Sequence, residues 1–142
     1  MTTTLTFKQS SDLNPALESS AKGELTGAKL LGRWLNTNRE TRGIAECVIT
    51  AEGEGFKVQI LGVGDPGLIE WPVIQATTMA NLEEEAGQRT VALAADVDFD
   101  FMRIETHIRI NKGVLVIVLF CTFTDGSGRS NYLNREFFSR RD

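Results

Sequence analysis

Histidine, cysteine and proline are scarce in this chain, and their scarcity excludes several kinds of site. Histidine occurs once, cysteine twice and proline 3 times among 142 residues. One histidine cannot build a His-rich metal centre, and Cys47 and Cys121 lie far apart with no CxxC spacing, so no zinc or redox motif is formed. We therefore expect two reduced, buried thiols that act as small hydrophobic residues, and no metal or cofactor.

Long apolar runs and a strong charge of either sign are also absent. The run Val114–Cys121 is far shorter than the roughly 20 residues that a membrane-spanning helix needs. The first residues have no basic start followed by an apolar core, so we expect no signal peptide and a cytoplasmic protein. The net charge is −4, whereas a nucleic acid or an anionic membrane favours a basic face. We expect neither as a partner.

The composition of the chain changes near residue 30. Residues 1–30 have few large apolar groups and are expected to form a tail with a short helix. That helix would begin at Asn14-Pro15, with Asn14 as its cap and Pro15 in its first turn, and would stop at Gly23. A second short turn is expected over 25–31. Residues 31–142 are expected to form one β-domain, since a chain of this size needs no metal or disulfide to fold.

Eight segments beyond residue 31 have the composition or the alternation of β-strands. In Met102–Asn111, for example, Ile104, Ile108 and Ile110 alternate with charged residues. Pro72 lies inside the fourth segment and predicts an edge, a bulge or a sharp bend, because proline has no N–H to donate. The expected strands are 32–36, 44–51, 56–63, 68–79, 89–100, 102–111, 113–123 and 131–140.

Most of these segments are joined by short turns, and no helix of real length separates them. Parallel strands need long crossover connections, so the strands are expected to be antiparallel. Eight antiparallel strands in chain order predict an all-β fold, either an up-and-down barrel or a sandwich. An eight-stranded barrel has an interior just wide enough for side chains or for one small ligand.

Gly32-Arg33-Trp34 opens the first strand directly after a short helical lead-in. It resembles the Gly-x-Trp signature of the calycin superfamily, which includes lipocalins, fatty-acid-binding proteins and avidins. Two stretches are similar to small uncharacterised bacterial calycin-like proteins: Trp34, Asn36 and Thr41–Ile44 in the first, and Phe123–Tyr132 with Asn134–Glu136 in the second. The resemblance implies an eight-stranded calycin-type barrel, closed at one end by a basic residue of the last strand that packs over the tryptophan. Arg135 is the residue expected to stack on Trp34, by a cation–π contact.

Two side chains are candidates for acid–base chemistry, Glu46 and His107. His107 is the only histidine and lies on the polar face of its strand, where it is either a general base in the interior or part of a solvated outer face. Glu46 is an isolated acid in phase with Ile44 and Val48, which predicts either an interior carboxylate with a raised pKa or an exposed, Arg-paired one.

Four side chains are candidates for contact with a ligand: Trp71, Phe101, Arg109 and Tyr132. Trp71 and Tyr132 are aromatic residues with a polar group, and they lie near strand starts, where the mouth of a barrel is expected. Arg109 shares the polar face of its strand with His107. For the aromatic residues, simple filling of the core is the alternative interpretation.

Three functions fit these observations. The first is a binding protein whose barrel encloses a small, largely apolar molecule, an expectation that rests on analogy of fold. The second is a cofactor-independent cyclase or isomerase that acts on a hydrophobic intermediate inside the barrel. The third is a structural homo-oligomer with a filled barrel. Gly113–Phe123 is apolar on both faces, which favours some assembly, such as a homodimer.

Overall fold

The computed structural model describes residues 24–53, 55–80 and 88–141. The helix expected after Asn14-Pro15 lies outside the described residues. Near the turn expected over 25–31, the structure has a short strand, β1 (Glu24–Thr26), and a 3-10 turn, η1 (Ala28–Leu30). The other regular elements of the described residues are β-strands.

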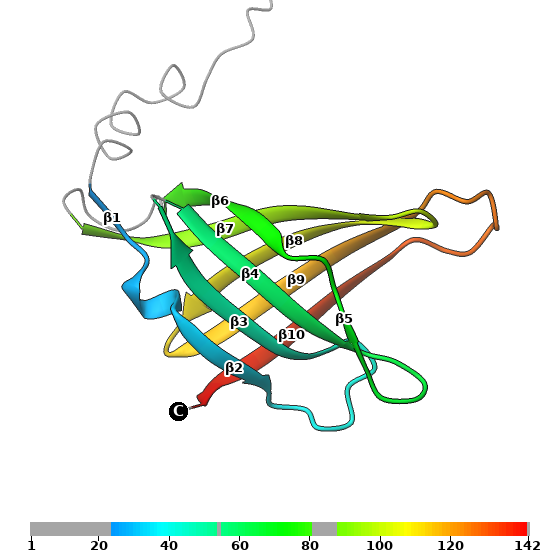
Figure 1. Cartoon of the computed structure of the whole chain (residues 1–142), viewed down its shortest axis with the longest axis horizontal. Coiled ribbons are helices and arrows are strands. Elements are labelled where there is room, and N and C mark those ends of the chain that lie inside the picture. The colour runs from blue at the N-terminus through cyan, green and yellow to red at the C-terminus, as the bar shows by residue number, and fades with distance from the viewer. Residues whose placement is uncertain (1–23, 54, 81–87, 142) are drawn as a thin grey trace, which may run out of the picture.

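Eight strands close into an antiparallel barrel, as expected from the sequence (Figure 1). They follow one another around the ring in chain order, and the last pairs with the first. β1 adds a short parallel pairing to β7, and β5 (Leu68–Glu70) pairs with β4 outside the ring. The eight are β2 (Gly32–Asn36), β3 (Ile44–Glu52), β4 (Gly55–Val63), β6 (Ile74–Ala80), β7 (Gln88–Phe99), β8 (Met102–Asn111), β9 (Val114–Phe123) and β10 (Tyr132–Arg141).

The segment 68–79, expected as one strand, is divided into β5 and β6. The break falls at residues 71–73, around Pro72, which cannot donate to a ladder. β6 consequently pairs with β4 only through Val58 and the residues before it, and β5 pairs with the last part of β4. Residues 64–73, which we call the strap, therefore lie beside the last part of β4, on the edge that β6 occupies nearer the start of β4 (Figure 1).

The barrel has a closed end, where the chain enters β2 and leaves β10 (Figure 1). Trp34 and Phe138 are buried there beneath η1, and the Trp34 Nε1–H donates to the Leu30 carbonyl oxygen at 2.9 Å. The Arg140 guanidinium stacks on the Trp34 ring at 4.4 Å and donates to the carbonyl oxygens of Leu31 and Lys29. A last-strand arginine thus closes this end of the barrel.

The arginine that stacks on Trp34 is therefore Arg140, and the expected Trp34–Arg135 contact is not formed. Inward positions on β10 are the even-numbered ones, as the burial of Phe138 shows. Arg135 is exposed on the outer surface, with its guanidinium 5.4 Å from the Phe137 ring. Side chains alternate between the two faces of a strand, so residue 140 shares the face of Phe138 and residue 135 does not.

The interior is apolar along most of its length. The inward side chains of β8 and β9 are buried, including Ile104, Ile108, Leu115, Ile117 and Leu119. Thr106, the buried polar residue among them, donates its hydroxyl to the Ala95 carbonyl oxygen at 2.9 Å. Among the described helical segments, none has the length and hydropathy required to cross a membrane.

Candidate functional site

A cavity of about 960 Å³ occupies the open end of the barrel, opposite η1. Its volume is at the upper end of the range of about 300–1,000 Å³ that small-molecule sites have. The β2–β3 loop, the strap, the β7–β8 turn and the start of β10 surround its mouth. The interior of the barrel is thus packed at one end and hollow at the other.

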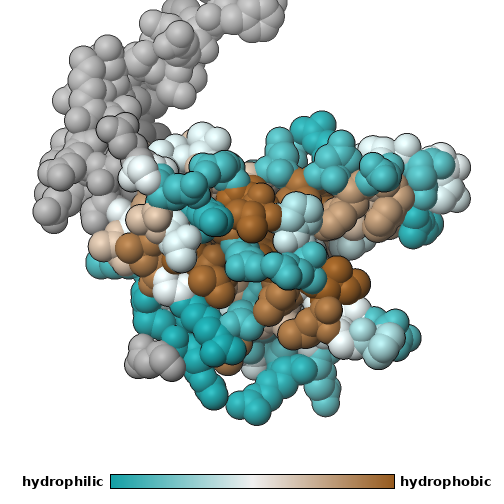
Figure 2. Space-filling view, in the orientation of Figure 1, coloured by the Kyte–Doolittle hydropathy of each residue, from teal (hydrophilic) through white to brown (hydrophobic). Residues whose placement is uncertain are grey.

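One side of the cavity is apolar. Ile104 and Leu119 form part of its wall, and Phe99 and Met102 lie nearer the mouth. Trp71 of the strap completes this side. Figure 2 shows that the molecular surface around β5 is also hydrophobic, and Leu68 and Ile69 are among the exposed residues there.

Trp71 is positioned by both its backbone and its neighbours. Its N–H donates to the Ile60 carbonyl oxygen at 3.0 Å, and its ring lies over Gly62. A Cβ on Gly62 would stand 2.6 Å from the Trp71 Nε1, so glycine is needed for this close approach. The edge-to-face contact with Phe99 has a centroid distance of 5.4 Å, and Phe99 in turn lies 6.2 Å from Phe101. Trp71 is thereby held against the cavity.

The opposite side of the cavity is polar, and β10 provides most of it. Tyr132, Asn134 and Glu136 occupy successive inward positions on this strand and line the cavity. Successive inward positions are roughly 7 Å apart along a strand. Exposure falls from Tyr132 at the mouth to the half-buried Glu136, and then to the fully buried Phe138. A row of polar groups therefore leads from the mouth down to the packed core.

Glu136 lies at the inner end of this row and is held by three donors. The Asn36 side-chain amide donates to Oε1 at 3.0 Å, the Thr41 hydroxyl donates to the same oxygen, and the Ile44 N–H donates to Oε2 at 2.9 Å. Gly43 leaves room for the carboxylate, because a Cβ there would stand 2.5 Å from Oε2. These bonds fix the β2–β3 loop to β10 and fix the orientation of the carboxylate.

Tyr132 and Cys121 lie opposite each other on neighbouring strands and both line the cavity. Burial, followed by the neighbouring Cys121 thiol, raises the pKa of Tyr132 to about 12. Burial also raises the pKa of the Cys121 thiol, and the Tyr132 hydroxyl partly opposes that shift. Both groups are therefore uncharged at neutral pH.

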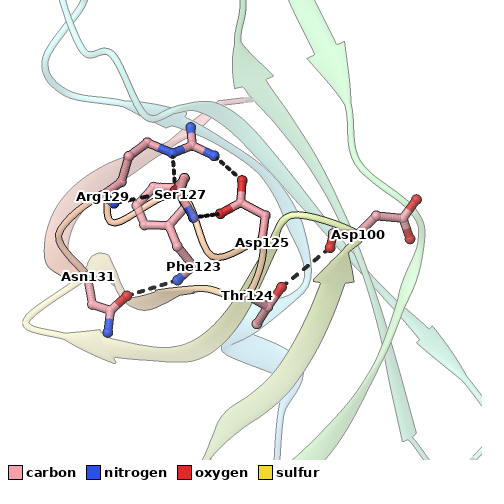
Figure 3. Close-up of polar contacts among 7 residues, drawn as sticks. All are labelled: Asp100, Phe123, Thr124, Asp125, Ser127, Arg129 and Asn131. Atoms are coloured by element: carbon pink, nitrogen blue, oxygen red, sulfur yellow. Dashed lines mark hydrogen bonds and ion pairs between the residues drawn. The ribbon is translucent and has the colours of Figure 1, made fainter.

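The loop between β9 and β10 is held in shape by Arg129 (Figure 3). Arg129 donates to Asp125 at 2.7 Å and to the Ser127 hydroxyl at 3.0 Å. Its guanidinium lies 4.2 Å from the Phe123 ring and 5.6 Å from the Phe101 ring. The hydrogen bonds from Ser127, followed by that from Arg129, lower the pKa of Asp125 to about 2. This arginine clasp joins the loop to the β7–β8 turn beside the mouth.

No family model, curated protein or solved structure matches the chain. The chemistry of the site must therefore follow from its own residues. Among the described residues, no group of three or more His, Cys, Asp or Glu side chains is arranged to hold a metal ion.

Three of the four candidate ligand-binding residues line the cavity: Trp71, Phe101 and Tyr132. Their contact with a ligand stays a prediction. Arg109, the fourth, is exposed on β8, where the buried residues Ile104, Thr106 and Ile108 occupy the inward positions. The charged face of this strand therefore points to solvent, and Arg109 does not border the cavity.

The two candidate catalytic residues also lie on the outer surface. His107 is exposed, with its ring 5.2 Å from that of Phe120. Glu46 forms an ion pair with Arg33. An irregularity of register between Ile44 and Glu46 changes the phase of β3, so that Cys47 points inward after Ile44. Of the two alternatives that the sequence left open for each residue, the structure has the Arg-paired Glu46 and the solvated His107.

Four polar residues that line the cavity were not among the candidates: Asn36, Thr41, Asn134 and Glu136. The spacing of Asn134 and Glu136 from Phe138 is the one signal in the sequence that places them inside, because residues two apart share a face. Asn36 and Thr41 join them only through the fold, since about 100 residues separate Asn36 from Glu136.

Proposed function

We propose that the barrel binds a small, largely apolar molecule in the cavity at its open end. The observation that carries the proposal is the cavity itself, which has one apolar side and a few fixed polar groups on the other. Such a combination is usual for small-molecule sites, in which apolar surface supplies affinity and a few polar groups fix orientation. The cavity also favours this proposal over the structural alternative, a filled barrel.

We also propose that the barrel is of the calycin type. Gly32-Arg33-Trp34 begins β2 directly after η1, and Arg140 of the last strand covers Trp34. This arrangement agrees with what the resemblance implied, with Arg140 in the place expected for Arg135. Proteins of that type commonly bind ligands in the barrel, which supports the binding proposal by analogy of fold.

Neither candidate catalytic residue of the enzymatic alternative borders the cavity. Glu46 and His107 lie on the outer surface, so neither reaches a substrate in the cavity. Glu136 is an interior carboxylate, but three donors already hold it in one orientation. Binding therefore agrees with the geometry better than cyclase or isomerase chemistry does.

The proposal can be tested with an apolar fluorescent probe titrated into the protein. Leu119→Phe adds bulk on the cavity wall, and we expect it to weaken binding of the probe by about tenfold. Val118→Phe is the matched control, because the same strand carries Val118 on its outer face. The emission of Trp71 should change on binding in the wild type, and Trp71→Phe should remove that change. Equal affinity of the two phenylalanine variants would refute binding in this cavity.

A further inference from the structure

Glu136 is a half-buried carboxylate without a cationic partner in the described part of the chain. It takes part in none of the ion pairs found among those residues. Its donors are an amide, a hydroxyl and a backbone N–H, all of them neutral. Hydrogen bonds from neutral groups orient the negative charge without cancelling it. Charges removed from water are usually paired, and none of the ion pairs among the described residues supplies a cation to this carboxylate.

The position of Glu136 directs this charge toward the cavity. Both Glu136 and Asn134 line the cavity, and both lie next to Gly43. A carboxylate has about four acceptor positions, of which the three donors use three, so one remains for a ligand. The donors to Glu136 come from β2, from the start of β3 and from the loop between them. We infer that the remaining position faces the cavity, and that a positive group entering the cavity can reach it.

The other charged residues that border the cavity are Glu40, Arg42 and Arg135, and all three are exposed. Water screens exposed charges strongly, whereas the field of a partly buried charge persists over short distances. The half-buried carboxylate therefore dominates the electrostatics in the inner part of the cavity, and it disfavours an anionic head group there.

We propose that the ligand is an apolar amine, bound as its ammonium ion; this proposal rests on the proposed binding function. The ammonium group donates to Glu136, and the apolar part lies along Leu119, Ile104 and the aromatic residues near the mouth. Aromatic rings also attract cations, so Trp71 and Tyr132 favour the same class of ligand as it enters.

Three probes with one chain length separate the head-group preference from apolar binding: decylamine, decan-1-ol and decanoate, each below its micelle concentration. We expect the wild type to bind decylamine about tenfold more tightly than decanoate, with decan-1-ol between them. In Glu136→Gln, the amine should lose about tenfold in affinity while the alcohol changes by less than about threefold. Glu105→Gln on the outer face is the control for the change in net charge, and it should alter none of the three affinities.

The outcomes distinguish the two proposals. Equal binding of the three probes, or preference for decanoate, overturns the amine proposal and leaves apolar binding intact. No binding of any probe refutes the proposed function itself. The wild-type preference is measured without any substitution, so the test holds even if Glu136→Gln weakens the fold. If the wild-type preference persists unchanged in a folded Glu136→Gln protein, Glu136 is not its source.

Discussion

The closure of the barrel by Arg140 leads to a sharp prediction about two arginines of the same strand. In Arg140→Ala the protein loses a cation–π stack on Trp34 and two hydrogen bonds to the Leu31 and Lys29 carbonyl oxygens. A cation–π contact contributes about 0.5–2 kcal/mol, and hydrogen bonds of charged groups about 1.5–3 kcal/mol each when they are buried. Water reaches the exposed guanidinium, so we expect a total loss of about 2–3 kcal/mol, below the simple sum.

The control is Arg135→Ala. The exposed guanidinium of Arg135 lies beside the Phe137 ring and makes no contact with Trp34, so its loss should lower the free energy of unfolding by less than about 1 kcal/mol. Arg140→Lys should lie between the two, because it keeps the charge and loses the fork that reaches two carbonyl oxygens.

Urea unfolding followed by tryptophan fluorescence measures all three free energies. Trp34 is 1% exposed, so its emission should shift to longer wavelength when the barrel unfolds. A domain of this kind has about 5–15 kcal/mol of stability, so each variant should remain folded without denaturant. Equal losses for Arg140→Ala and Arg135→Ala, or a larger loss for the latter, would refute the assignment of Arg140 as the closing residue.

Three further predictions follow from the cavity and from the outer surface. Tyr132 is the one tyrosine of the chain, so its absorbance titration near 295 nm should have a midpoint of about 12 in the native protein, and Cys121→Ala should lower that midpoint. Because folding raises the pKa of Tyr132, the stability that this group contributes is present below pH about 10 and is lost between pH about 10 and 12. A titration midpoint near the ordinary tyrosine pKa of about 10 in the native protein would contradict this prediction. Burial, and next the charge of Glu46, raise the pKa of Cys47 to about 12, and burial raises the pKa of Cys121. Neither thiol should therefore react with a disulfide reagent at pH 8 until denaturant is added. Rapid reaction of both thiols in the native protein would refute this prediction. Finally, Phe120, Leu133 and Phe137 are exposed together on β9 and β10, which supports the proposal of a homodimer; Leu133→Lys should then weaken association in sedimentation velocity, and a wild type that is monomeric at every concentration would exclude it.

The strands could be predicted from the sequence wherever one face is clearly apolar. β8 alternates isoleucine with charged residues, and the structure places Ile104 and Ile108 inside and Arg103 and His107 outside. Water and the apolar core select opposite faces of such a strand, so both the strand and its orientation follow from local pattern. The number and order of the barrel strands then follow from the short connections between them.

The orientation of β10 could not be predicted in the same way. Leu133 and Phe137 lie on one face, and Tyr132 and Phe138 on the other, so hydrophobicity does not distinguish inside from outside. Arg135 and Arg140 lie on opposite faces for the same reason, and pairing with the neighbouring strands decides which of them reaches Trp34. In β3, the irregularity after Ile44 reverses a phase that regular alternation would preserve.

The two ends of β10 have different roles in the barrel. At the closed end, Phe138 fills the interior and Arg140 covers Trp34, so this part of the strand stabilises the fold. Glu136 lies two positions before Phe138, nearer the mouth, and places a fixed carboxylate where apolar packing ends. Asn134 and Tyr132 extend the polar row outward from it. Among the described residues, none of the ion pairs includes this carboxylate, which is costly for stability alone. On the proposal of an amine ligand, the ligand supplies the positive charge, and the functional part of this strand begins where its core packing ends.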